Sequence, residues 1–338
     1  MKNGITKFNY FLDQLQALLL KAEKQKNPGL WLYQNNARTP LFMLEGLAKL
    51  YAGLHNKKKF SKIKAQFKVL EDILGAVDYY DSFAKEFSTN KSIPVNVTGY
   101  LQAQSREKIQ SLNETLKEQE WLGSANKRII KIRKKLGEAD WKKDATEIKS
   151  MNRFYNEAIA EIVSFTGRSD FHFSNVESDV HELRRKLRWL SIYPQALRGT
   201  IQLSYSRLKN GQLKTVPKQL EKYLTPAILN SPFNKMPDAD DNSNFLLLEQ
   251  NYFYALSWMI AELGKLKDSG LRLVAIKEAL QQLSPGTEAE ALAKARQYTG
   301  AGQPDLEQVL DNADRICKTY FKEQNLQKLV IGTAVTVK

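Results

Sequence analysis

Apolar residues recur every three to four positions along most of the chain, which places them on one face of an α-helix. Proline and glycine, which interrupt helices, are sparse at 10 and 17 of 338 residues. We therefore expect an all-α fold. The spacing predicts helices over residues 8–20, 39–54, 60–87, 101–116, 127–136, 144–165, 180–197, 245–283, 286–299 and 305–325.

Three further segments lack this helical spacing. Residues 167–178 are rich in Ser, Asp and Asn, which predicts a connection between two halves. Residues 209–244 contain several prolines, which predicts an insertion with little regular structure. The tail from Leu329 to Val337 is β-branched and is either a short strand or frayed.

Polar residues and prolines mark some of the helix ends. Thr39 before Pro40 is typical of an N-cap followed by proline at the first helical position. Ser178 is a candidate N-cap for the helix over 180–197, which Pro194 should bend or end.

Two segments resemble each other and indicate an internal repeat. Residues 73–83, ILGAVDYYDSF, and 262–272, ELGKLKDSGLR, both place Leu-Gly in mid-helix and acidic residues further on. A glycine inside a helix costs about 1 kcal/mol relative to alanine. Unless the similarity is chance, Gly75 and Gly264 therefore mark close helix crossings.

The helices that precede these segments also align. Residues 39–50 match 178–189 without gaps, which sets Phe42 and Glu45 where the second half has His181 and Arg184. We predict two tandem helical-bundle repeats. The first repeat covers 1–170 with an N-terminal helix, and the second covers 171–338.

The net charge of the chain bears on the kind of partner it could bind and not on its fold. The chain has 51 Lys and Arg against 37 Asp and Glu, a formal charge of +14. Such a chain attracts nucleic acid, anionic lipid or an inorganic polyanion, although solubility alone is a sufficient explanation.

Cysteine content and the N-terminal pattern favour a cytoplasmic protein. The single Cys317 cannot form an internal disulfide, and no Cys/His set has zinc-ligand spacing, so we expect no metal and no cofactor. The apolar run over 8–20 is interrupted by Asp13 and is too short to span a membrane, and no cleavage pattern follows it.

The strongest chemical signal lies in residues 179–190, DVHELRRKLRWL. His181, Arg184 and Arg188 are three and four positions apart and therefore share one helix face beside an apolar stripe. Repulsion between these cations would be relieved by a bound anion, and the arginine fork matches phosphate oxygens. The alternative is that the arginines pair with a carboxylate such as Glu177 or Glu182 and that His181 is an ordinary core residue.

This segment resembles the signature helix of the CHAD family, the conserved histidine α-helical domain. That pattern has an apolar residue, His, two residues, Arg, and a basic residue one turn later, which VHELRRKLRW matches. The family's Leu-Gly mark with a later acidic residue resembles Leu74-Gly75 with Asp78 and Leu263-Gly264 with Asp268. The first half departs from the pattern, since it retains only Arg38 and Lys49 among comparable cations.

The resemblance implies two helical repeats around a basic channel or groove that binds inorganic polyphosphate or a similar polyanion. We expect no catalysis, because we find no phosphate-binding loop, nucleophile elbow or metalloprotease motif. Localisation would be cytoplasmic, with polyphosphate granules as one possible site. The candidate polyanion-binding residues are His181, Arg184, Arg185, Arg188, Lys49, Arg38, Lys265 and Lys267.

A different class of function stays open. Two runs of basic residues, Lys57–Lys64 and Lys127–Lys135, are typical of solvated helix faces, but they could also contact nucleic acid. The alternative function is therefore a nucleic-acid-binding or protein-scaffolding helical protein.

Overall fold

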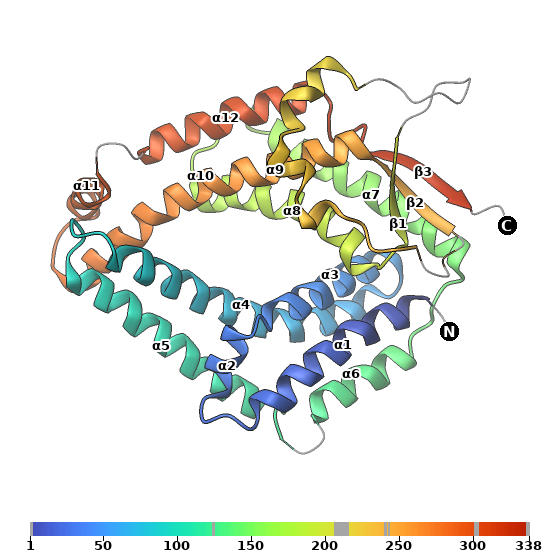
Figure 1. The fold of residues 1–338 in the computed structure, drawn as a ribbon, viewed down its shortest axis with the longest axis horizontal. Helices are drawn as coiled ribbons and strands as arrows, with labels where there is room; N and C mark the ends of the chain where they lie inside the picture. The colour runs from blue at the N-terminus through green and yellow to red at the C-terminus, as the bar shows by residue number, and fades with distance from the viewer. Residues whose placement is uncertain are drawn as a thin grey trace.

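The computed structural model describes residues 3–123, 126–205, 216–239, 242, 244–300 and 304–335, and this part of the chain is mostly helical (Figure 1). The helices of the first half are α1 Asn3–Ala22, α2 Pro28–Gln34, α3 Arg38–Leu54, α4 Lys57–Ser88, α5 Val95–Glu118, α6 Lys127–Gly137 and α7 Asp144–Gly167. Those of the second half are the π-helix η1 Val176–His181, α8 Glu182–Ala196, α9 Pro226–Leu229, α10 Gln250–Leu283, α11 Glu288–Thr299 and α12 Leu306–Lys322. The strands are β1 Ile201–Ser204, β2 Asn244–Glu249 and β3 Val330–Val335.

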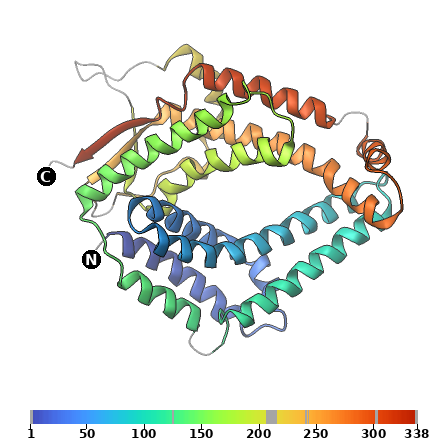
Figure 2. The same ribbon diagram turned by 180° about the vertical axis from the view of Figure 1, so that it is seen from behind.

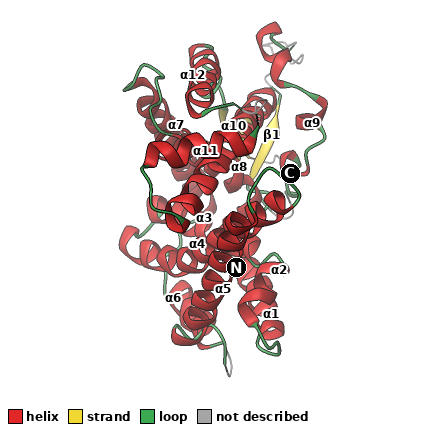
Figure 3. Ribbon diagram, turned by 90° about the vertical axis from the view of Figure 1, so that its left-hand side faces the viewer, coloured by secondary structure: helices red, strands yellow, loops and turns green. Residues whose placement is uncertain are grey.

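The helices form two groups that meet along α3 and α8. In Figures 1 and 2, α1 to α6 lie on one side of the molecule, and α7, α8, α10 and α12 lie on the other. α7 packs against α8 and against strands β2 and β3. Figure 3 shows that helix makes up nearly the whole body. The all-α class is therefore correct apart from one small sheet.

The largest buried cluster joins the two groups. It contains Phe8 of α1, Leu44 of α3, Leu187 of α8 and Phe253 of α10, none of them exposed to solvent. Burial of side chains of this size is the main stabilising contribution to such a fold. The proposed repeats therefore share one core, and their boundary at residue 170 stays a prediction.

The crossing of α3 and α8 fixes the helices that carry the candidate site. The Phe42 ring stacks on Trp189 with centroids 4.7 Å apart. A Cβ atom added to Gly46 would lie 3.1 Å from Trp189 and 3.4 Å from Ile192. The absence of a side chain at Gly46 thus lets α8 approach α3 closely.

The prediction of one helix over 245–283 was wrong at its start. Residues 244–249 form β2, which pairs parallel to β1 and antiparallel to β3, and α10 begins only at Gln250. Leu246 and Leu248 are buried at alternating positions, as strand geometry requires. For the tail, the strand alternative is confirmed over Val330–Val335, and Val337 lies outside the described residues.

Both predicted N-caps were wrong. Thr39 lies inside α3, which begins at Arg38. The second cap is Asn175, three residues before Ser178, because its side chain accepts hydrogen bonds from two backbone N–H groups at the start of η1. Pro194 lies within α8, which ends two residues later. Within the insertion, the described residues form three short helical turns over 218–223, 226–229 and 232–234.

A cluster of buried polar side chains lies where α1, α3 and α7 meet. The Glu147 carboxylate accepts a hydrogen bond from the Tyr51 hydroxyl at 2.7 Å. It also faces Lys7 Nζ at 3.9 Å and His55 Nε2 at 3.6 Å. Lys7 is only 5% exposed, and burial lowers its pKa to about 8. Burial in this cluster therefore disfavours the charged form of Lys7.

The lowered pKa of Lys7 predicts that the protein becomes more stable above neutral pH. The Lys7 proton leaves near pH 8 in the folded protein and near pH 10.5 in the unfolded chain, so the unfolded chain binds more protons between these values. The free energy of unfolding should consequently increase with pH in that window. Denaturation of Lys7→Met from pH 7.5 to 9.5 should show a rise smaller by about 2 kcal/mol than that of the unmodified protein. Equal rises in both proteins would contradict the assignment.

Candidate functional site

A groove of about 1160 Å³ lies between α4, η1, α8 and α10. Five of the eight candidate residues contribute to its wall, and they come from both halves of the chain. These are Arg38, His181, Arg184, Arg188 and Lys267. The other three, Lys49, Arg185 and Lys265, are not part of the wall.

Arg184 lies flat against α10 at Gly264. A Cβ atom at Gly264 would come within 3.0 Å of the Arg184 Nε, which donates a hydrogen bond to the Ile260 carbonyl at 3.2 Å. Within the described residues, no carboxylate forms an ion pair with Arg184. Burial lowers the pKa of Arg184, and Asp268 partly offsets this effect. Gly264 therefore makes room for a cation that has a carbonyl partner but no carboxylate partner.

Arg38 occupies the matching position on α4, at Gly75. A Cβ atom there would lie 2.9 Å from the Arg38 guanidinium. Arg38 differs from Arg184 in its partners, because its Nε lies 2.8 Å from Glu71 and its Nη1 lies 3.2 Å from Asp78. Its charge is thus already neutralised. The two mid-helix glycines accommodate arginine side chains, where we had expected closely crossing helices.

The internal repeat stays a prediction, and these two contacts fit a register of it other than the expected one. Arg38 and Arg184 are 146 positions apart, whereas the expected alignment pairs residues 139 positions apart, such as 39 with 178. The new register pairs Phe42 with Arg188, and these two residues touch across the α3–α8 crossing. The two registers differ by seven residues, close to two helical turns, so both keep the apolar stripe in phase.

Arg188 is the least compensated cation of the groove. Its guanidinium lies 4.5 Å over the Phe42 ring, a favourable cation–π contact. Among the described residues, no carboxylate or carbonyl forms a hydrogen bond or ion pair with it. Burial and the neighbouring charges of Arg184 and Arg38 lower its pKa to about 10. An external anion would supply the missing partner.

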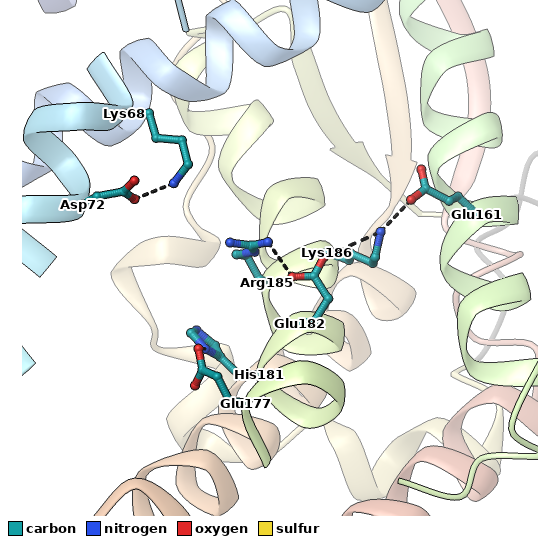
Figure 4. A network of polar contacts seen from close by, with 8 residues as sticks. All are labelled: Lys68, Asp72, Glu161, Glu177, His181, Glu182, Arg185 and Lys186. Carbon is teal, nitrogen blue, oxygen red and sulfur yellow. Dashed lines mark hydrogen bonds and ion pairs between the residues drawn. The ribbon is translucent and has the colours of Figure 1, made fainter. Parts of the chain in front are cut away.

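The other two candidate residues in the wall have carboxylate partners. His181 Nδ1 lies 2.7 Å from Glu177, and this hydrogen bond lowers the pKa of Glu177. The two side chains lie beside each other in Figure 4. Lys267 Nζ lies 2.8 Å from Asp268. The alternative of carboxylate pairing is therefore wrong for Arg184 and Arg188. His181 is not the core residue that the alternative expected, because it lines the groove with its side chain 31% exposed.

The three candidates outside the wall have other contacts. Arg185 pairs with Glu182 at 2.6 Å, beside the Lys186–Glu161 pair of Figure 4. Lys265 pairs with its neighbour Glu262 at 2.6 Å. Lys49 lies 4.9 Å over the Trp189 ring, and burial lowers its pKa to about 8.

The wall also carries carboxylates that sequence reasoning did not assign to the site. They are Glu71, Asp72, Asp78, Glu86, Glu177, Asp268 and Glu288. Asp78 and Asp268 had a sequence signal in their position after the Leu-Gly pairs, and Glu177 had been considered only as an ion-pair partner of the arginines. The groove is therefore mixed in charge, and it also carries Arg272 and Lys277, which pair with Glu86 and Glu288.

The two basic runs do not belong to the groove wall. Lys59 of the first run donates a hydrogen bond to the Glu138 carbonyl at 2.8 Å. In the second run, Lys131 pairs with Glu120 and Arg133 lies 2.5 Å from Asp13. Both runs thus contain residues that tie helices together.

Neither a membrane-spanning helix nor a metal-ligand cluster occurs within the described residues, and two comparisons with known proteins found no match. Within the described residues, no helix is long and apolar enough to cross a membrane. The same residues contain no group of three His, Cys, Asp or Glu side chains arranged to hold a metal ion. No protein-family model matches the chain, and no curated protein matches it at a significant level.

Proposed function

We propose that this protein binds inorganic polyphosphate, or a similar phosphate-rich polyanion, in the groove. The observation that carries the proposal is the pair of adjacent arginines, Arg184 and Arg188, which line the groove without carboxylate partners. The resemblance to the CHAD family supports the same ligand, and membership in that family is part of the proposal. A granule of polyphosphate in the cytoplasm is the location that such binding would favour.

The surroundings of Arg184 and Arg188 favour the binding of a phosphate group. Both arginines are half-buried and near each other, so each raises the free energy of the other's charged form. Phosphate oxygens that accept hydrogen bonds from the two guanidinium groups would offset this repulsion. They would also replace the water molecules that burial excludes from these groups. Arg38 would join only in competition with Glu71 and Asp78, so the second half supplies most of the binding.

We propose binding without hydrolysis. Metal-assisted phosphate hydrolysis uses converging acidic or histidine ligands around the ion. Among the described residues, no three His, Cys, Asp or Glu side chains are placed to hold one metal ion. The carboxylates closest to Arg38 are engaged with that arginine.

Calorimetric titration with long-chain polyphosphate at several salt concentrations tests the proposal. We expect binding at low salt that weakens steadily as salt rises, because the interaction is between charges. RNA and DNA at matched phosphate concentration serve as competitors. Absence of polyphosphate binding, or nucleic acid that polyphosphate does not displace, would instead favour a nucleic-acid-binding or scaffolding protein.

Neutralising Glu71 should tighten polyphosphate binding. Glu71→Gln removes the charge that holds Arg38 at 2.8 Å, so the guanidinium becomes available to a bound phosphate. One additional charge-assisted hydrogen bond of about 1.5 kcal/mol corresponds to roughly a tenfold gain in affinity. Asp72→Asn is the matched control, because Asp72 pairs with Lys68 rather than with Arg38. A gain of equal size in both variants would show that only net charge matters.

A further inference from the structure

The groove changes character along its length. Beyond Arg184 and Arg188, aromatic and aliphatic side chains line the wall beside two ion pairs, Arg272–Glu86 and Lys277–Glu288. The residues of this apolar end are Tyr79 and Phe83 of α4, Leu271 and Val274 of α10, and Leu306 and Leu310 of α12. An inorganic polyanion would leave these six side chains without a favourable contact, because it carries no apolar group. The two cations beside them already have carboxylate partners.

The two ends of the groove are separated by a length that suits a small organic phosphate. Phe83 follows Gly75 by eight residues on α4, so it lies about 12 Å further along the helix at 1.5 Å per residue. Leu271 follows Gly264 by seven residues on α10, which corresponds to about 10 Å. Because Arg38 and Arg184 lie against these two glycines, both helices lead from cation to apolar surface over the same span.

The apolar end has a polar edge. Tyr79 meets Phe83 edge-on, with ring centroids 5.1 Å apart. Among the described residues, the Tyr79 hydroxyl has no hydrogen-bond partner, and burial raises its pKa, so it stays protonated and can donate. A flat ring with polar atoms at its rim fits this combination, since aromatic side chains stack on every nucleobase. A plain alkyl chain would leave the hydroxyl unused.

We propose that the groove binds a nucleoside polyphosphate, with its phosphates at Arg184 and Arg188 and its base against Tyr79 and Phe83. This inference rests on the proposed anion binding and names the class of ligand for the same site. The triphosphate and sugar would bridge the span between the two ends of the groove.

Comparison of ATP with methyl triphosphate tests the inference, because the two compounds have closely similar charge and only ATP carries a base. We expect ATP to bind about tenfold more tightly, in line with the contribution of one stacked base. Phe83→Ala should abolish this difference while leaving the affinity for methyl triphosphate unchanged. Phe83→Leu, which preserves apolar volume, should also reduce the difference. Phe233→Ala is the control, because Phe233 is 78% exposed and is not part of the wall.

The outcomes separate this inference from the function on which it rests. Equal affinities for ATP and methyl triphosphate would overturn the nucleotide assignment, even if both compete with polyphosphate. Decyl triphosphate binding more tightly than ATP would overturn it as well and would assign the apolar end to alkyl chains. If neither these triphosphates nor polyphosphate bind, both the inference and the proposed function are wrong.

Discussion

Arg188→Met is expected to weaken polyphosphate binding at least tenfold without lowering the stability of the protein. The arginine supplies charge-assisted hydrogen bonds to the ligand, each worth about 1.5 to 3 kcal/mol. In the unbound protein it is a half-buried cation that has no ion-pair partner among the described residues and whose pKa has fallen to about 10. Methionine keeps much of the side-chain volume and removes this unfavourable charge.

Two measurements on Arg188→Met are therefore needed together. Calorimetric titration gives the affinity for polyphosphate, and denaturant unfolding gives the free energy of unfolding, which should be unchanged or about 1 kcal/mol higher. A purely structural arginine would behave differently, since its removal would reduce stability. Loss of stability together with unchanged affinity would contradict our account of Arg188.

Glu147→Ala is expected to destabilise the protein by about 3 to 5 kcal/mol, the usual cost of removing one partner from a buried ion pair. Glu147 is 2% exposed and is the carboxylate that faces Lys7, Tyr51 and His55. Its loss leaves the buried Lys7 ammonium without a counter-charge, a state that costs more than the missing hydrogen bond.

Glu157→Ala on the same helix provides the control for Glu147→Ala. Glu157 lies 3.9 Å from Arg153, and both side chains are 69% exposed. Exposed pairs of this kind contribute about 0 to 1 kcal/mol. Denaturant unfolding of both variants should therefore give very different losses, and a loss below 1 kcal/mol for Glu147→Ala would show that the buried cluster is not stabilising.

The helices could be predicted from the sequence because each one buries a continuous apolar stripe. The stripe marks the middle of a helix better than its ends, and for this reason 60–87 was close to α4, whereas Thr39 and Ser178 were both misassigned as caps. Residues 244–249 were missed for a different reason. Their partners β1 and β3 are distant in sequence, so the pairing that makes them a strand leaves no local signal.

The candidate site was predicted only in part. Helical spacing correctly placed His181, Arg184 and Arg188 on one face, and all three line the groove. Spacing could not reveal their partners, because the carboxylates that neutralise Arg38 lie on another helix, 33 and 40 residues away. It also could not fix the register of the predicted repeat, since a shift of seven residues leaves the apolar face almost unrotated.

The central claim is that Arg184 and Arg188 bind a polyanion through their position in the groove and not through net charge alone. Arg184→Ala and Arg185→Ala test it directly, because the two residues are adjacent, each variant removes one positive charge, and only Arg184 lines the groove. Titration with polyphosphate should show a loss of roughly tenfold or more for Arg184→Ala and a change within about twofold for Arg185→Ala. Equal losses in the two variants would contradict the claim.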